Sequence, residues 1–421
     1  VEIVGDVKFD EVGIIHASFP FPVMLKDGDV RVNKQGIWID KVNQIQFVGP
    51  GKGVGTLLGE ILFDDDGAVP NIQLSLHNEK ITPELIESIA YSAGDSYETA
   101  LSLLSGLGLD ARLSVVGNFS GNGISGLNTN FIVEIEDGTA VPNEQLAHAI
   151  GATSAFWPDD FALSQLQAAM TIDNGYVVMD HVTAKCGDGN IKAALKLKQD
   201  DLELMLAGYK LPLSKHFVNV LRSNASEKLS SAWNWLNPTG TVDVDMRVMH
   251  TNDSSNLHLE VVPNVFEVNS PTGTSKLERE RGSIVVENSN VFLNDLKFEF
   301  LSDNREIGIL EMMGEVFGSS DNFNFRLNAT LDKMGLSSPL TRSLTGIVGG
   351  EVAANYFDLI QPEGIAFAEL SANGSQDEFA YHFAIQPESL SAIFHDHKAH
   401  ATFDESTKAD VIVFDNEGIH F

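Results

Sequence analysis

One supersecondary unit recurs about three times along this chain, and this repetition constrains the possible folds more than any other feature. Each copy has a strand of alternating apolar residues, a short basic-hydrophobic segment, a helical stretch, and a break before the next strand. The basic-hydrophobic segments begin at Lys80, Lys210 and Lys333, which lie at nearly even spacing. This period is too long for ankyrin or propeller repeats. It predicts one module that is used repeatedly to extend a single architecture.

A second marker, a hairpin turn between alternating segments, runs in phase with the first. Asn and Gly, which tolerate the positive φ of tight turns, are common in these turns. The turns fall at 33–36, 173–175, 287–290 and 415–418. Because the fourth turn opens a further copy, we expect the chain to be a piece of a longer protein. The markers predict modules at 1–140, 141–265 and 266–390, and the start of a truncated fourth module at 391–421.

Period-two alternation of apolar and polar residues predicts that most of the chain forms β-strands. Segment 241–248 reads Thr-Val-Asp-Val-Asp-Met-Arg-Val, and 297–300 follows the same rule. Such strands have one apolar and one wet face, and the short turns between them favour an antiparallel meander. We therefore predict a mainly β fold with short helices: an elongated antiparallel β-sheet built from repeated modules and curved into an open apolar groove. A closed β-sandwich rod is the alternative.

Helix pairs are expected at one equivalent place in each copy, at 82–105, 214–235 and 338–358. In the first copy, Thr82 is followed by Pro and Glu, which is the order of an N-cap, an N1 proline and an early acid. Asp95 or Ser96 can cap the second helix of that pair. The apolar-rich segment 146–150 is compatible with another short helix.

Composition excludes several classes of protein. The net charge of −32 disfavours binding to the phosphate backbone of nucleic acids. The single cysteine, Cys186, excludes an internal disulfide framework and a cysteine-based zinc site. No run of about 18 apolar residues is present, so this piece is not expected to span a membrane. Hydrophobic residues make up 43% of the chain, which is typical of a folded protein.

Three segments resemble ligand-binding motifs, and each also has a simpler explanation. The glycine-rich segment 49–56 does not match a Walker A motif, because its lysine precedes a glycine rather than Ser or Thr, and it reads as a flexible hairpin loop. The histidines at 395, 397 and 400 could ligate a metal from one strand face, but they also fit a solvated edge. The acidic turn 64–67 lacks the distal Glu of a calcium loop. We therefore predict no metal site, no cofactor and no enzymatic activity.

The repeated segments resemble those of bacterial AsmA-like proteins, in particular the long forms built from repeated units. The resemblance rests on Lys210-Leu211-Pro212-Leu213-Ser214, on the break Leu236-Asn237-Pro238-Thr239-Gly240, and on the opening segment 19–32. It covers nearly the whole chain, although the first copy lacks the Pro-x-Gly break and the third has Gly335 in place of the proline. The resemblance implies a periplasmic protein anchored in the inner membrane by an N-terminal helix outside this chain. It further implies a kinship with bridge-like lipid transfer proteins, whose repeating β modules form an apolar groove.

Two functions follow from these observations. The first is a lipid-binding or lipid-transport groove that serves cell-envelope or outer-membrane biogenesis, with phospholipid or another acyl lipid as partner and membrane contact through the missing termini. Burial of each methylene contributes about 0.8 kcal/mol, so one acyl tail could gain on the order of 10 kcal/mol before costs. The candidate lining residues are Ile72, Leu74, Leu76, Leu202, Leu204, Leu206, Val242, Val244, Met246, Phe323, Phe325 and Leu327. The second function is a structural or adhesive β-rod whose apolar residues form an ordinary core.

Overall fold

The computed structural model confirms a mainly β, antiparallel fold with short helices. The structure describes residues 5–16, 19–39, 44–64, 67–91, 93–121, 127–149, 161–199, 201–213, 234–251, 254–271, 273–288, 290–301, 307–319, 322–375, 379–394, 397–402, 412–415 and 418–420. Two compact units are distinguished. Unit 1 comprises Val1–Trp157, Phe161–Ala207 and Arg247–Ser255, and unit 2 comprises Pro158–Asp160, Gly208–Met246 and Asn256–Phe421. The three predicted modules stay a prediction.

Unit 1 contains a meander in which successive strands pair antiparallel. Its strands are β1 (Gly5–His16), β2 (Phe19–Asn33), β3 (Gly36–Ile39), β4 (Ile45–Val48), β5 (Val54–Asp64), β6 (Gly67–Lys80), β7 (Leu109–Gly121), β8 (Leu127–Ala140), β9 (Ser164–Asp173), β10 (Tyr176–Cys186) and β11 (Gly189–Lys198). The short strands β3 and β4 both lie between β2 and β5. Two further strands, β12 (Asp201–Leu213) and β13 (Thr239–His250), contribute residues to both units.

Unit 2 has the same antiparallel pattern. They are β14 (Ser255–Ser270), β15 (Gly273–Glu287), β16 (Asn290–Leu301), β17 (Ile307–Ser319), β18 (Asn322–Gly335), β19 (Glu363–Ser375), β20 (Phe379–Phe394), β21 (His397–Thr402), β22 (Ile412–Asp415) and β23 (Gly418–His420). From β14 to β20 each strand pairs antiparallel with the next, and β20 pairs with both β21 and β22.

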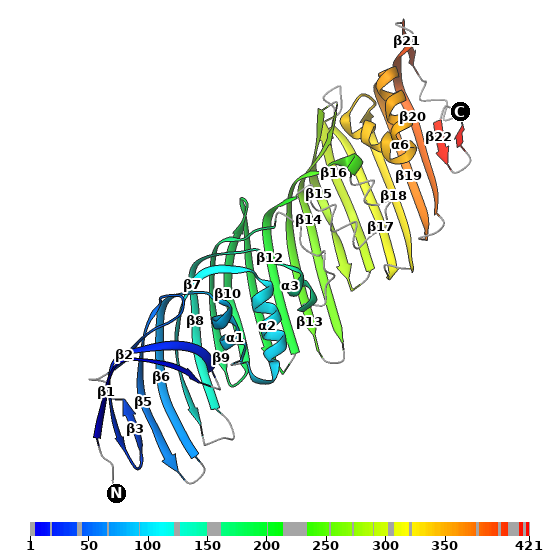
Figure 1. Cartoon of the computed structure of the whole chain (residues 1–421). Coiled ribbons are helices and arrows are strands. Elements are labelled where there is room, and N and C mark those ends of the chain that lie inside the picture. Colours follow the sequence, from blue (N-terminus) through cyan, green and yellow to red (C-terminus); the bar gives the residue numbers. More distant parts are fainter. Residues whose placement is uncertain are drawn as a thin grey trace. The chain divides into compact units, whose positions relative to one another are not determined.

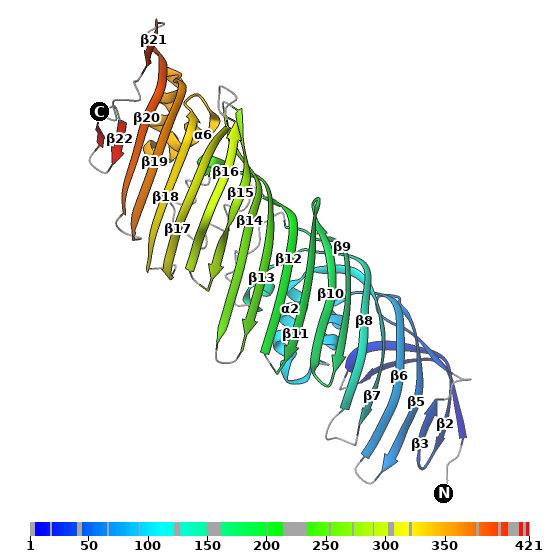
Figure 2. The same cartoon turned by 180° about the vertical axis from the view of Figure 1, so that it is seen from behind.

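The helices of unit 1 lie over one face of its strands (Figures 1 and 2). They are α1 (Pro83–Tyr91), a 3-10 turn (Gly94–Ser96), α2 (Tyr97–Gly106) and α3 (Glu144–Ala149). The N-cap prediction at Thr82 is confirmed, because its hydroxyl accepts a hydrogen bond from the Leu85 amide at 3.3 Å. Ser96 occupies the N-cap of α2, but its side chain forms no capping hydrogen bond. The short helix expected near 146–150 is α3.

In unit 2, α6 (Pro339–Ile360) likewise covers part of one face of the sheet (Figures 1 and 2). Ser338 caps the helix by accepting a hydrogen bond from the Thr341 amide at 3.2 Å. The helix is kinked at Gly350, whose φ of 67° and ψ of −164° only glycine adopts readily. The expected helix pair at 338–358 is therefore two helical segments joined at this glycine. The pair expected at 214–235 lies almost entirely outside the described residues.

Alternation along the strands produces the two-faced sheet that the sequence predicts. On β6, Ile72 and Leu76 are each only 2% exposed, whereas Gln73 and His77 between and beyond them are exposed. The same rule holds on β18, where Ala329 and Leu331 belong to the core. Because residues opposite each other in a ladder point to the same side, the apolar residues of neighbouring strands join into one face.

Two features of the repeat recur at the level of backbone geometry. Left-handed residues interrupt the strands at Asn78, Lys210 and Lys333, with φ of 58°, 54° and 53°. The first and third coincide with register shifts in the β6–β7 and β18–β19 ladders, which marks β-bulges. The equivalent of Lys210 in the first copy is thus Asn78 rather than Lys80. The four predicted hairpin turns are confirmed by the pairs β2–β3, β9–β10, β15–β16 and β22–β23.

The break between helix and strand is shared by the second and third copies. Pro238 and Pro362 are both buried, and each is preceded by a left-handed residue. Two residues after the proline, the chain enters the strand through Gly240 or Gly364, with φ of 139° and 131°. A Cβ at Gly364 would lie only 2.0 Å from the carbonyl oxygen of Ser389, so the strands approach too closely there for any other residue.

Candidate functional site

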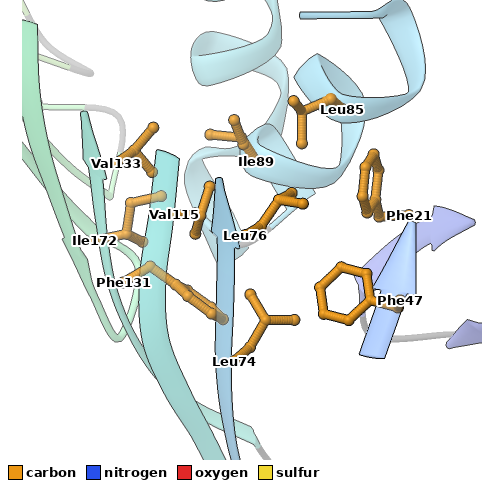
Figure 3. Close-up of a pocket in the computed structure, with 10 residues that line it drawn as sticks. All are labelled: Phe21, Phe47, Leu74, Leu76, Leu85, Ile89, Val115, Phe131, Val133 and Ile172. Carbon is orange, nitrogen blue, oxygen red and sulfur yellow. The ribbon is translucent and has the colours of Figure 1, made fainter. Parts of the chain in front are cut away.

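The apolar face of unit 1 is packed beneath α1 (Figure 3). Leu85 and Ile89 of α1 point toward side chains that come from six strands, β2, β4, β6, β7, β8 and β9. These side chains are Phe21, Phe47, Leu74, Leu76, Val115, Phe131, Val133 and Ile172. Phe21 and Phe47 belong to β2 and β4, so the first strands of the unit curl toward the helix and close the layer from one side.

The space left between these side chains is small. Its cavity volume is about 10 Å³, which is about enough for one water molecule. Dense packing of this kind is typical of a protein core. The part of the layer that these ten residues line therefore has no room for an acyl chain in this conformation.

The candidate residues on β6 belong to this packed layer. Ile72 and Leu76 are buried, and Leu74 is half-buried and lines the small cavity. The structure brings Leu74 and Leu76 together with Val115 of β7, which lies opposite Leu76 in the ladder. Sequence alternation therefore identified the apolar face correctly, but it could not show that α1 covers it.

The candidates on β12 and β13 alternate with charged residues, except that Met205, which is 38% exposed, separates Leu204 from Leu206. Leu202 is 2% exposed and Met246 is 3% exposed, whereas Leu204, Leu206, Val242 and Val244 are half-buried. Glu203, which lies between Leu202 and Leu204, forms ion pairs with Arg247 at 2.7 Å and with Lys196 at 3.6 Å. These partners lower the pKa of Glu203 through a hydrogen bond from Arg247 and the charge of Lys196. The acids of these strands thus serve the polar face.

The candidates on β18 lie on the apolar face of unit 2, beyond its closely packed part. Phe323, Phe325 and Leu327 are all half-buried, and the same face then continues into Ala329 and Leu331, which belong to the core. The rings of the two phenylalanines are neighbours, with centroids 6.4 Å apart. This end of the strand therefore presents apolar side chains that its surroundings leave partly open to solvent.

The neighbours of these residues extend the same surface. Phe325 lies opposite Val316 of β17, and Leu327 lies opposite Gly314. Leu327 and Leu293 approach each other over Gly314, at 3.3 and 3.4 Å from the point where a Cβ would stand. The apolar surface is therefore lowest at Gly314, which has no side chain. We name this surface, formed by Leu293, Val316, Phe323, Phe325 and Leu327, the apolar strip.

The opposite face of unit 2 carries ion pairs, together with exposed apolar residues such as Met313 and Phe317. Arg281 donates hydrogen bonds to both carboxylate oxygens of Asp295, at 2.7 and 3.2 Å. This contact holds the pKa of Asp295 below its ordinary value. Lys297 lies 2.9 Å from Glu280 and 3.6 Å from Glu311. An exposed pair such as that of Arg281 with Asp295 adds little stability.

The glycine-rich loop of 49–56 is a hairpin loop between β4 and β5, as predicted, and it is tied to the protein by Glu79. The Glu79 carboxylate is fully buried and accepts hydrogen bonds from the amides of Gly51 and Gly53, both at 2.5 Å. Backbone amides grouped in this way form an anion site. Here the anion is the protein's own carboxylate, so these two amides are already occupied. Sequence reasoning missed Glu79, whose one signal is a carboxylate at the bulge of β6.

Other expected features give no site among the residues that the structure describes. No group of three or more His, Cys, Asp or Glu side chains in the described ranges could hold a metal ion. The histidine cluster is only partly within those ranges, because residues 395 and 396 lie outside them. None of the described helices is long and apolar enough to cross a membrane. No protein-family model, curated protein or solved structure matches this chain.

Proposed function

We propose that this protein binds the acyl chains of a lipid on the apolar face of its sheet, as a lipid-binding or lipid-transport protein of the cell envelope. The observation that supports this proposal is the apolar strip of unit 2, whose large side chains are only half-buried although they continue a closely packed core. An apolar surface next to a core is stabilised when a ligand of matching chemistry covers it. The resemblance to AsmA-like proteins adds the periplasm as the proposed location.

Methylene burial provides the driving force. Each methylene removed from water contributes about 0.8 kcal/mol, so contact with half of a 16-carbon tail yields about 6 kcal/mol before the costs of association. This gain requires no polar group on the strip. The proposed ligand is therefore a phospholipid or another acyl lipid.

A structural β-rod is the second candidate, and the packed layer of unit 1 favours it. A cavity of about 10 Å³ under α1 is what a closed core would show. If unit 2 had the same character, the half-buried residues of β18 would only be the margin of a core. The two functions therefore differ in whether the apolar strip holds a ligand.

The proposal is tested with a pair of charge substitutions on opposite faces of unit 2. Phe325→Glu places a carboxylate on the apolar strip, where contact with acyl chains would cost several kcal/mol. Phe317→Glu places the same charge on the opposite face of β17, where Phe317 is 39% exposed. Both variants and the parent are purified. Bound lipid is detected by native mass spectrometry of the intact protein and by lipid extraction, and the thermal unfolding of each protein is recorded.

The lipid groove predicts co-purified lipid in the parent and in Phe317→Glu, and its loss in a folded Phe325→Glu. The double variant Leu204→Glu with Val244→Asp extends the test to β12 and β13. A parent protein without lipid, together with unfolding of Phe325→Glu, would favour the structural rod.

A further inference from the structure

Arg279 is a cation on the apolar face of unit 2. It lies on β15 directly opposite Phe298 of β16, and two residues earlier Leu277 lies opposite Phe300. Phe298, Phe300 and Leu277 are at most 5% exposed and belong to the core. Since opposite residues of a ladder share a side, the Arg279 side chain leaves the sheet on the core side.

The guanidinium of Arg279 has little to bind within the protein. Its Nη1 donates one long hydrogen bond, 3.4 Å, to the carbonyl oxygen of Gly282. Its Nε is buried and has no hydrogen-bond partner among the described residues. A buried donor without a partner is costly, so such a group indicates that water or a ligand completes it.

Five other arginines in the described ranges have a carboxylate partner, whereas Arg112 donates a hydrogen bond to the carbonyl oxygen of Asn78 at 2.7 Å. Arg31, Arg247, Arg281, Arg326 and Arg342 each lie within 4 Å of a carboxylate. Arg279 forms no ion pair in the described part of the chain, although the protein carries 59 acidic residues.

The acids next to Arg279 in sequence are directed to the other face of the sheet. Glu278 lies opposite Glu299, and Glu280 pairs with Lys297 at 2.9 Å. The fork of an arginine binds carboxylates and phosphates in a bidentate manner, and no described residue supplies a carboxylate to Arg279. The site is therefore suited to an anion from outside.

We propose that Arg279 binds the anionic head of an amphiphile, a carboxylate or a phosphate, while its apolar tail lies on the face that Phe298 shares. This inference rests on the proposed lipid-binding function and specifies the ligand: an acyl chain that ends in an oxyanion. The same chemistry would also hold free phosphate, which has no tail.

The test compares ligands that differ only at the head. Purified, delipidated protein is titrated with hexadecanoate, hexadecyl phosphate, the neutral hexadecanol, and inorganic phosphate. Arg279→Gln removes the charge, Arg279→Lys keeps the charge without the fork, and Arg326→Gln is the matched control on the polar face, where Arg326 pairs with Glu315 at 3.6 Å. Circular dichroism establishes that each variant is folded.

Arg279→Gln is expected to weaken the binding of hexadecanoate and hexadecyl phosphate about tenfold or more, which is the value of a charge-assisted hydrogen bond, and to leave hexadecanol within about twofold. Arg279→Lys should fall between the parent and Arg279→Gln, and Arg326→Gln should match the parent. Equal weakening of hexadecanol, or no change for any anion, would overturn the role of Arg279. If Arg279→Gln fails to fold, Arg279→Lys decides by the same comparison.

The proposed function and this inference can fail separately. If hexadecanol and hexadecanoate both fail to bind the parent, the acyl groove is refuted. The titration with inorganic phosphate then tests the anion site by itself. Phosphate binding to the parent that is lost in Arg279→Gln supports an anion site at Arg279, and the absence of phosphate binding to the parent overturns it. If hexadecanol binds the parent as tightly as hexadecanoate does, the groove stands and the headgroup role of Arg279 is rejected.

Discussion

Removal of the Glu79 carboxylate is expected to destabilise unit 1 more than any other single change to an acid there. The side chain is fully buried, and both of its oxygens accept backbone hydrogen bonds at 2.5 Å. Glu79→Ala leaves the amides of Gly51 and Gly53 without an acceptor, which costs about 1–3 kcal/mol for each. Release of the carboxylate from its buried position offsets part of this loss. We expect a net loss of about 2–4 kcal/mol in the free energy of unfolding.

Glu79→Gln separates the hydrogen bonds from the shape of the side chain. The amide oxygen can still accept from one glycine, but the NH2 group faces the other glycine donor to donor. We expect a loss of about 1–3 kcal/mol, smaller than that of Glu79→Ala. Glu134→Gln, an exposed position of β8, is the control and should change stability by less than about 0.5 kcal/mol.

The assay combines urea unfolding followed by circular dichroism with hydrogen exchange of the loop peptide that contains Gly51 and Gly53. In the parent, the amides of both glycines should exchange slowly because the carboxylate holds them. In Glu79→Ala they should exchange much faster than the amides of β7. Equal stability of Glu79→Ala and Glu134→Gln, with unchanged exchange in the loop, would refute the idea that Glu79 ties the loop to β6.

Three further changes are expected to act in unit 2. Asp358 has a pKa below its ordinary value of 3.8 because Arg342 donates two hydrogen bonds to it at 2.7 and 2.8 Å. Its contribution to stability is present at pH values above 3.8 and is lost as the pH falls through the lowered pKa, so the difference in Tm between the parent and Asp358→Asn should shrink on acidification. Gly364→Ala should cost about 1–3 kcal/mol or more in urea unfolding, because alanine at a φ of 131° is strained and its Cβ would strike Ser389. Ser338→Ala should cost about 1 kcal/mol and increase hydrogen exchange in the first turn of α6, and an unchanged first turn would contradict its capping role.

Features that depend on local patterns could be predicted from the sequence. Alternation identified the two faces of β6 and β18, and the caps at Thr82 and Ser338 follow from the order of a few residues. The position of α1 over Leu76 could not be predicted, because it depends on the curl of β2 and β4 toward the helix.

The sequence analysis also did not identify two charged residues whose side chains point toward the interior. Glu79 and Arg279 each occupy a place where alternation or a bulge directs a charged side chain inward. The sequence shows this for Arg279, since Leu277 two residues earlier is an apolar core residue. What it cannot show is that the Arg279 Nε lacks a partner, because that depends on where every neighbouring acid points.

The glycine at the return from helix to strand limits how such a chain can evolve. In the second and third copies, Gly240 and Gly364 have no room for a Cβ. A Cβ at Gly108 in the first copy would lie 2.4 Å from the carbonyl oxygen of Val141. If the copies arose by duplication, each copy retains a glycine at this junction because a side chain does not fit there. Glycines at these junctions would then mark the copies even where the strands between them differ in sequence.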